Sequence, residues 1–165
     1  MSLPLFHAIL FYMFAAVAVG AALAMVVQRN PTYSAFALIV SLVSLAGIFG
    51  LLGSPFIAAL QIVVYAGAIM VLFLFVLMLL GVKPEDRPSG GTLKAVALAL
   101  VSALALQVGA VLAGAARPPV AAFDASTRAV AQVLFSAPYL YVFEATSILI
   151  LAALVGSIVL ARREP

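Results

Sequence analysis

The sequence predicts an all-α fold, that of a polytopic integral membrane protein with five transmembrane helices. Apolar side chains make up 67% of the 165 residues and charged side chains only 8%, against about 25% charged residues in typical soluble domains. A membrane-spanning helix needs about 20 apolar residues, and five stretches of that length occupy most of the chain. Two of them lie in a run without formal charge, from Pro31 to Val82. We expect residues 1–165 to form a single membrane domain.

The first three spans are separated by residues that end helices. The first span covers about residues 3–28 and ends at Arg29-Asn30-Pro31, because proline lacks the amide donor and restricts the residue before it. Gly53-Ser54-Pro55 divides the uncharged run into a second span, residues 32–52, and a third, residues 56–82. A very tight turn is therefore expected between the second and third spans.

A polar loop, residues 83–92, follows the third span and is rich in residues that favour turns. The fourth span covers about residues 93–116. Residues 117–137 mix polar and apolar side chains, which predicts an interfacial loop with a short helix. The fifth span covers about residues 138–161, and Pro138 suits its first turn.

The basic residues are distributed unequally between the two sides of the membrane. Those on the side of the C-terminus are Arg29, Lys83, Arg87, Lys94, Arg162 and Arg163. Only Arg117 and Arg128 lie on the opposite side. Because positive residues concentrate in cytoplasmic loops, we expect the C-terminus in the cytoplasm and the N-terminus outside.

Composition excludes several classes of function. The chain has no cysteine and a single histidine, His7, which excludes a thiolate metal site, an iron–sulfur ligand set, a disulfide framework and a histidine metal cluster. The scattered basic residues form no patch that could neutralise a phosphate backbone, so nucleic acid is not an expected partner. No arrangement of nucleophile and base is present. We therefore expect no catalytic residue and no metal site.

The third span contains the most informative polar residues. Tyr65 lies about nine residues beyond Phe56, which is roughly 14 Å into a bilayer core about 30 Å thick. Tyrosine usually lies at the interface, so a hydroxyl near the midplane needs a partner. Gln61 lies one turn earlier on the same face, and Gly67 follows where a helix deforms easily. Two interpretations stay open: a π-bulge with a freed carbonyl, or a tyrosine bonded to a neighbouring carbonyl in an ordinary helix.

Glu144 is the acidic residue that lies within an apolar span. Ionisable groups inside a membrane are costly and often mark ion paths or buried pairs. Tyr141 and Ser147 lie three residues to either side and share its face. The carboxylate is either an ion site or a structural group near the outer interface, stabilised by its own helix N-terminus or by a basic neighbour.

Small residues recur at helix-packing spacing in three of the spans. They are Ala16, Gly20 and Ala24 in the first, Gly47, Gly50 and Gly53 in the second, and Gly109 and Ala113 in the fourth. Such rows allow close approach of helices inside a membrane. Because they point in several directions, contacts with other chains are expected.

Three segments resemble a known family. They are NPTYSA at residues 30–35, QIVVYAGAIMVLFLFV at residues 61–76, and the end of the fifth span, Phe143-Glu144-Ala145 with residues 154–162. These segments resemble the NuoJ/ND6 subunit of respiratory complex I, the proton-pumping NADH:quinone oxidoreductase. The resemblance covers nearly the whole chain and is weaker across residues 87–137.

This resemblance implies five helices in the membrane arm of that complex, beside an ND4L-like subunit, near the quinone-site subunit and with antiporter-like subunits as further partners. It implies a π-bulge around Tyr65 and Gly67, whose rotation makes or breaks a water path for protons. With Gln61 and Glu144, these are the candidate proton-path and gating residues. FMN, iron–sulfur clusters and quinone would be bound by partner subunits, with none bound by this chain.

We therefore predict a non-catalytic subunit of a proton-translocating NADH:quinone oxidoreductase in the bacterial inner membrane, which couples quinone reduction to proton translocation. One alternative is a self-sufficient small homo-oligomeric transporter with Glu144 as its ion site. Another is a purely structural subunit that holds its neighbours together. Activity of the chain alone in liposomes would favour the transporter, and normal pumping after substitution of Tyr65 and Gly67 would favour the structural subunit.

Overall fold

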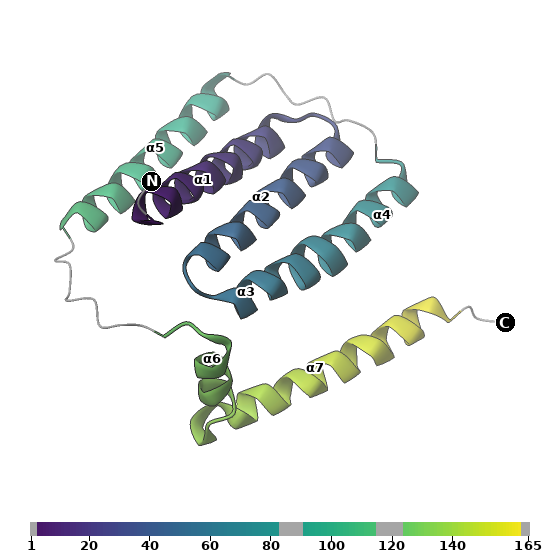
Figure 1. The fold of residues 1–165 in the computed structure, drawn as a ribbon. Helices are drawn as coiled ribbons and strands as arrows, with labels where there is room; N and C mark the ends of the chain where they lie inside the picture. The colour runs from purple at the N-terminus through teal and green to yellow at the C-terminus, as the bar shows by residue number, and fades with distance from the viewer. Residues whose placement is uncertain (1–2, 83–90, 115–123, 163–165) are drawn as a thin grey trace.

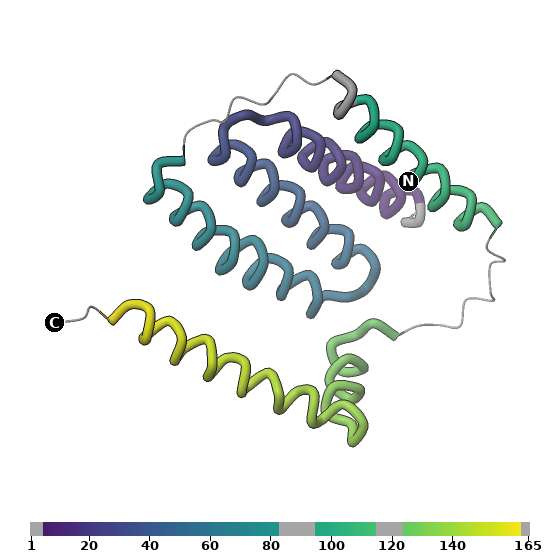
Figure 2. The backbone as a smooth tube through the Cα atoms, turned by 180° about the vertical axis from the view of Figure 1, so that it is seen from behind, coloured from purple at the N-terminus to yellow at the C-terminus, as the bar shows by residue number. Residues whose placement is uncertain are grey.

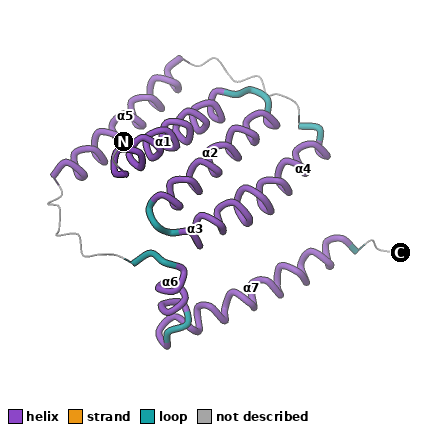
Figure 3. The backbone as a smooth tube through the Cα atoms, viewed as in Figure 1, coloured by secondary structure: helices purple, strands orange, loops and turns teal. Residues whose placement is uncertain are grey.

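The computed structural model describes residues 3–82, 91–114 and 124–162. Within these ranges the regular elements are helices, without strands, as Figures 1 and 3 show. Five helices are long and apolar enough to cross a membrane, which confirms the predicted all-α, five-helix membrane fold. The predicted polar loop, apart from residues 91 and 92, lies outside the described residues, as do the basic residues Lys83, Arg87, Arg117 and Arg163.

The N-terminal half is a layer of three antiparallel helices (Figure 1). α1 (Leu3–Val27) packs along α2 (Pro31–Leu51), and α2 packs along the third span. Asn30 caps α2, because its side-chain oxygen accepts a hydrogen bond of 2.9 Å from the Thr32 amide. The segment that ends α1 therefore also starts α2.

Two serine hydroxyls link α1 to α2. Ser34 Oγ donates to the Met25 carbonyl at 2.7 Å, and Ser41 Oγ donates to the Ala18 carbonyl at 3.1 Å. Hydroxyl groups commonly bond across helices in membranes, where little water competes. The two bonds lie at well-separated points along the pair and fix how the helices align.

Glycines at different positions have different surroundings. A Cβ atom built on Gly47 would lie 2.8 Å from the ring of Phe14, which is closer than real Cβ contacts. A Cβ atom on Gly50 would lie 4.0 Å from the Cβ atom of Ala58 in the third span, which is an ordinary van der Waals contact. Within the described residues, nothing lies within 4 Å of a Cβ atom on Gly20 or Gly109. The small-residue rows thus serve α1–α2 packing at Gly47 and leave other faces open.

A tight glycine turn connects α2 to the third span. Gly53 has a φ of 78°, a left-handed conformation that glycine adopts without strain. The Ser54 amide donates to the Phe49 carbonyl at 3.0 Å, and the Gly53 amide donates to the Gly50 carbonyl at 3.2 Å, which is the Schellman pattern of helix ends. Pro55 then begins the next helix.

The third span is continuous but changes its hydrogen-bond pattern twice. It consists of α3 (Pro55–Leu60), the π-helix η1 (Gln61–Ile69) and α4 (Met70–Leu80). Together these residues form one candidate membrane span of 26 residues. All three parts pack against α2, so the π-helix lies in the middle of a span that forms one edge of the packed layer (Figure 1).

The C-terminal helices stand apart from this layer. α5 (Gly91–Gly114) has no substantial packing against another described helix, and α7 (Ala137–Ala161) packs appreciably only against the short α6 (Thr127–Leu134). Figures 1 and 2 show α7 separated from the other long helices. The described helices therefore do not form a closed five-helix bundle.

The exposed surface supports the same conclusion. The chain exposes 13360 Å², whereas a compact soluble protein of its mass, 17.0 kDa, exposes about 7,700 Å². The buried apolar side chains among the described residues are small apart from one methionine: Ala18, Ala35, Ala46, Ala66 and Met70. Lipid or other chains must cover the remaining apolar surface.

Candidate functional site

The π-helix contains the two residues around which a bulge was predicted. The Met70 amide donates to the Tyr65 carbonyl, five residues earlier, and shares this bond with the Gly67 carbonyl. In an α-helix the same amide would bond to the Ala66 carbonyl, four residues earlier. The predicted π geometry at Tyr65 and Gly67 is therefore confirmed, and it extends over all of Gln61–Ile69.

Gly67 lies close to a backbone carbonyl of the π-helix. A Cβ atom on Gly67 would lie 3.1 Å from the carbonyl oxygen of Ile62, five residues earlier in the same π-helix. That distance is tighter than most real Cβ contacts, so a side chain at this position would require the carbonyl to shift by a few tenths of an ångström. The sequence argument identified the glycine but missed Ile62, because its contribution is a backbone atom that becomes a neighbour only in a π turn.

One side of the π-helix packs against α2, and the other side is exposed in the isolated chain. Ala66 and Met70 are buried on the side of the third span that packs against α2. The side chain of Tyr65 is 52% exposed in the isolated chain, and Gln61 is half-buried. The polar side chains of the site therefore border a surface that lipid or another chain can cover.

The structure brings Gln61, Tyr65 and Gly67 together on η1 but leaves Glu144 apart from them. Glu144 lies on α7, which packs appreciably only against α6 among the described helices. Its side chain is exposed. Within this chain, Glu144 and the π-helix do not form a common site.

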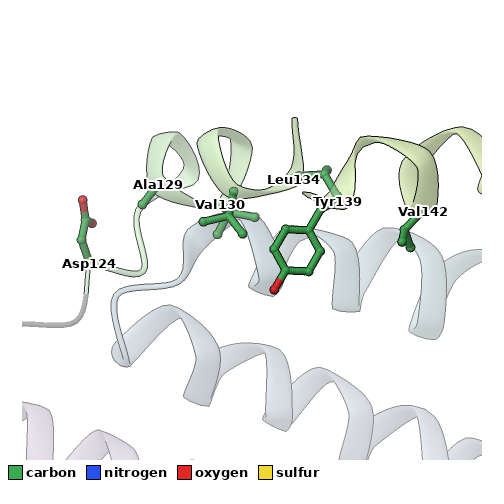
Figure 4. Close-up of a pocket in the computed structure, with 7 residues that line it drawn as sticks. Asp124, Ala129, Val130, Leu134, Tyr139 and Val142 are labelled. Carbon is green, nitrogen blue, oxygen red and sulfur yellow. The ribbon is translucent and has the colours of Figure 1, made fainter. Parts of the chain in front are cut away.

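A pocket between α6 and α7 was not anticipated from the sequence (Figure 4). Its volume is about 370 Å³, and its lining includes Val130, Tyr139 and Val142, with Asp124 at one edge. The Ser126 amide donates to Asp124 Oδ1 at 2.9 Å, and this bond, with the Ser126 hydroxyl, lowers the pKa of the Asp124 carboxyl below its ordinary value. An acidic residue, Asp124, followed two positions later by Ser126 directly before a helix, could have indicated this capping arrangement from the sequence. The described lining of the pocket is mainly apolar, and it contains no pair of groups for acid–base chemistry.

No group of histidine and acidic side chains able to hold a metal ion is found among the described residues. The residues of interest are instead backbone groups and uncharged side chains within a membrane span. These features define an integral membrane protein whose distinctive element among the described residues is the π-helical part of its third span.

Comparison with known proteins identifies the family. Residues 21–160 match the family described as NADH-ubiquinone/plastoquinone oxidoreductase chain 6, and the chain belongs to this family. NADH-quinone oxidoreductase subunit J of Pseudomonas aeruginosa is 42% identical over 165 aligned positions, which cover 93% of this chain and 96% of that protein.

Two further relatives come from other bacterial groups. Subunit J of Rhodobacter capsulatus is 38% identical, with coverage of 93% of this chain and 80% of that protein. NAD(P)H-quinone oxidoreductase chain 6 of Leptolyngbya boryana is 39% identical, with coverage of 93% of this chain and 79% of that protein. The predicted resemblance to the complex I subunit is thereby confirmed.

Proposed function

We propose that this chain is a membrane-arm subunit of a proton-translocating NADH-quinone oxidoreductase, in which its third span couples quinone reduction to proton translocation. The observation that carries the proposal is the π-helix Gln61–Ile69, with Gly67 placed directly against the Ile62 carbonyl. The family and the names of its relatives support membership of such a complex.

The proposed mechanism is a change between π and α hydrogen bonding. When the Met70 amide moves from the Tyr65 carbonyl to the Ala66 carbonyl, one residue leaves the wide turn. Because each residue of a helix turns the chain by about 100°, the part of the span before Met70 then rotates relative to α4. This rotation moves the Tyr65 hydroxyl between a buried partner and a water path, as in other two-state switches. Gln61 would move with it.

In this proposal the chain is a non-catalytic subunit. FMN, iron–sulfur clusters and quinone are bound by partner subunits, which supply the redox chemistry. The partners are an ND4L-like subunit, the quinone-site subunit and the antiporter-like subunits. The exposed faces of α5 and α7 support a place among such helices in preference to a self-sufficient transporter, because the described helices enclose no path among themselves.

The location proposed is the bacterial inner membrane, with the N-terminus outside and the C-terminus in the cytoplasm. The unequal distribution of basic residues supports this orientation. Glu144 would then lie toward the outer end of α7, and η1 toward the centre of the third span.

The test is substitution of Gly67 in the intact complex. Gly67→Val places a branched side chain against the Ile62 carbonyl, so we expect one helical state to be favoured. Proton translocation and quinone reductase activity in vesicles, normalised to assembled complex, should fall several-fold. Tyr65→Phe should give a milder defect, because a hydrogen bond in a membrane contributes only about 0.6 to 2 kcal/mol.

A matched control is Ala68→Val, which adds a branched side chain at the adjacent exposed position without facing the Ile62 carbonyl. This variant should retain nearly normal activity. Wild-type pumping and reductase activity in the Gly67→Val complex would contradict the proposed coupling role and leave the third span as a packing element.

A further inference from the structure

Glu144 has an ionisable side chain inside a membrane span but no donor within the described chain. The two hydroxyls that follow it in the sequence are already bonded to backbone: Thr146 Oγ1 donates to the Phe143 carbonyl and Ser147 Oγ to the Glu144 carbonyl, both at 2.6 Å. These bonds leave the Glu144 carboxylate without a hydrogen-bond or ion-pair partner among the described residues. A carboxylate within a span is costly unless another group pairs with it.

The helix that packs against α7 cannot supply this partner. α6 and the turn after it meet α7 at Tyr139, Val142 and Phe143, and the rings of Phe135 and Phe143 are 4.9 Å apart. At about 100° per residue, Glu144 is turned roughly 140° from Tyr139. The carboxylate therefore lies on the side of α7 that faces away from α6.

The depth of Glu144 also limits contact with water. It lies seven residues after Ala137, the first residue of α7, which corresponds to about 10 Å along the helix axis. Beyond it, the same side of the helix continues with exposed apolar residues, Ile148, Leu151 and Val155. Within α7, Glu144 is thus the one charged residue on this face, and an apolar stripe follows it along the helix.

We propose that this face of α7 is a docking surface for a transmembrane helix of another subunit, and that this helix carries a basic side chain that pairs with Glu144. The proposal rests on the proposed function, since it takes the partner from the same complex. Charge complementarity selects the occupant. Lipid tails offer no donor. In a second copy of this chain the basic residue within a spanning helix is Lys94, near the start of α5, and the proposed topology puts that end on the cytoplasmic side, away from Glu144.

Photocrosslinking in the assembled complex tests the position of the partner. The chain has no cysteine, so Ile148→Cys introduces its single thiol one turn from Glu144 on the same face. A benzophenone maleimide at this position should crosslink to one transmembrane segment of a neighbouring subunit, with a lysine or arginine within two turns of the crosslinked residue. Ala153→Cys, on the opposite side of α7, is the matched control and should not give this product.

Charge exchange tests the chemistry of the pair. Glu144→Leu and Glu144→Lys should lower the amount of this chain recovered in the purified complex several-fold. Replacing the mapped basic residue by glutamate should restore recovery of the Glu144→Lys variant. Thr146→Val removes a hydroxyl that bonds only to its own helix, so its recovery should stay at the wild-type level.

Crosslinking to lipid alone, to a segment without a basic residue, or equally from both thiol positions would overturn the inference. Normal recovery of Glu144→Leu, or no restoration by the charge exchange, would also overturn it. The wild-type chain separates this failure from that of the proposed function. If the wild-type chain does not co-purify with NADH-quinone oxidoreductase subunits, the proposed function is wrong. If it does co-purify and one of the outcomes above is found, only the docking inference is wrong.

Discussion

Gly47 sets the distance between α1 and α2 through its contact with Phe14. Gly47→Ala would place a methyl group 2.8 Å from the Phe14 ring, so the ring or the helix must move. Overpacking of this kind typically costs about 1 to 3 kcal/mol. We expect a lower thermal midpoint for the complex that contains this variant, measured in detergent, and partial recovery when Phe14→Leu is added.

Gly50→Ala is the matched control for this prediction. It is also a glycine in α2, but its added methyl group would make an ordinary contact of 4.0 Å. The change in helix propensity is the same at both positions, so any difference reports packing. Equal thermal midpoints for Gly47→Ala and Gly50→Ala would contradict the assigned role of the Phe14 contact.

Single residues differed in how well the sequence could predict them. Tyr65 and Gly67 could be identified, because a deep hydroxyl and an adjacent glycine are visible in the order of residues. The Ile62 carbonyl could not, since a backbone oxygen has no sequence signature until the hydrogen-bond pattern is known. Glu144 could be recognised as unusual, but the side of α7 on which it lies became meaningful only after α6 was placed.

At the scale of elements, the α1–α2 pair depends on its two interhelical serine bonds. Ser34→Ala and Ser41→Ala each remove one bond, which in membranes contributes about 0.6 kcal/mol on average. The bonds lie far apart, so the losses should add. Resistance of the complex to denaturation by sodium dodecyl sulfate should therefore fall slightly in each variant and further in the double variant.

Ser44 provides the control for this pair. Its hydroxyl is also buried, but it donates to the Val40 carbonyl of its own helix at 2.9 Å. Ser44→Ala should therefore have a smaller effect on denaturation than Ser41→Ala. A larger loss from Ser44→Ala would show that burial of a hydroxyl, and not the link between helices, determines stability here.

Element types were predictable to different degrees. Hydropathy and proline positions were sufficient to predict five apolar helices, because both act locally along the chain. The division of the third span into α3, η1 and α4 was not predictable from hydropathy, which is the same for π and α bonding. A bulge at Tyr65 and Gly67 was one of two open interpretations, and its length over Gln61–Ile69 emerged only from the backbone hydrogen bonds.

At the scale of the whole molecule, the predicted orientation can be tested directly because the chain lacks cysteine. A cysteine inserted after Ala161 should react with a membrane-impermeant maleimide only from the cytoplasmic side, in inside-out vesicles. Asp124→Cys should react only from the outer side, in intact cells. Labelling with the two sides exchanged would reverse the orientation and the assignment of Glu144 to the outer end of α7.

The arrangement of the helices was harder to predict than their number. Composition indicates that helices lie in a membrane, but it does not distinguish a closed bundle from helices that surround other chains. In this chain, α5 and α7 have none of their apolar window buried, while the α1–α2 pair and the third span form a packed layer. The assembly, more than this chain alone, completes the packing.

The central claim is that the third span changes its hydrogen-bond pattern during turnover. Density maps of the intact complex, resting and during oxidation of NADH with quinone, test it most directly. We predict that the Met70 amide bonds to the Tyr65 carbonyl in one state and to the Ala66 carbonyl in the other, with Tyr65 rotated by about 100°. The same π-helix over Gln61–Ile69, with Tyr65 unmoved in both states, would contradict this account.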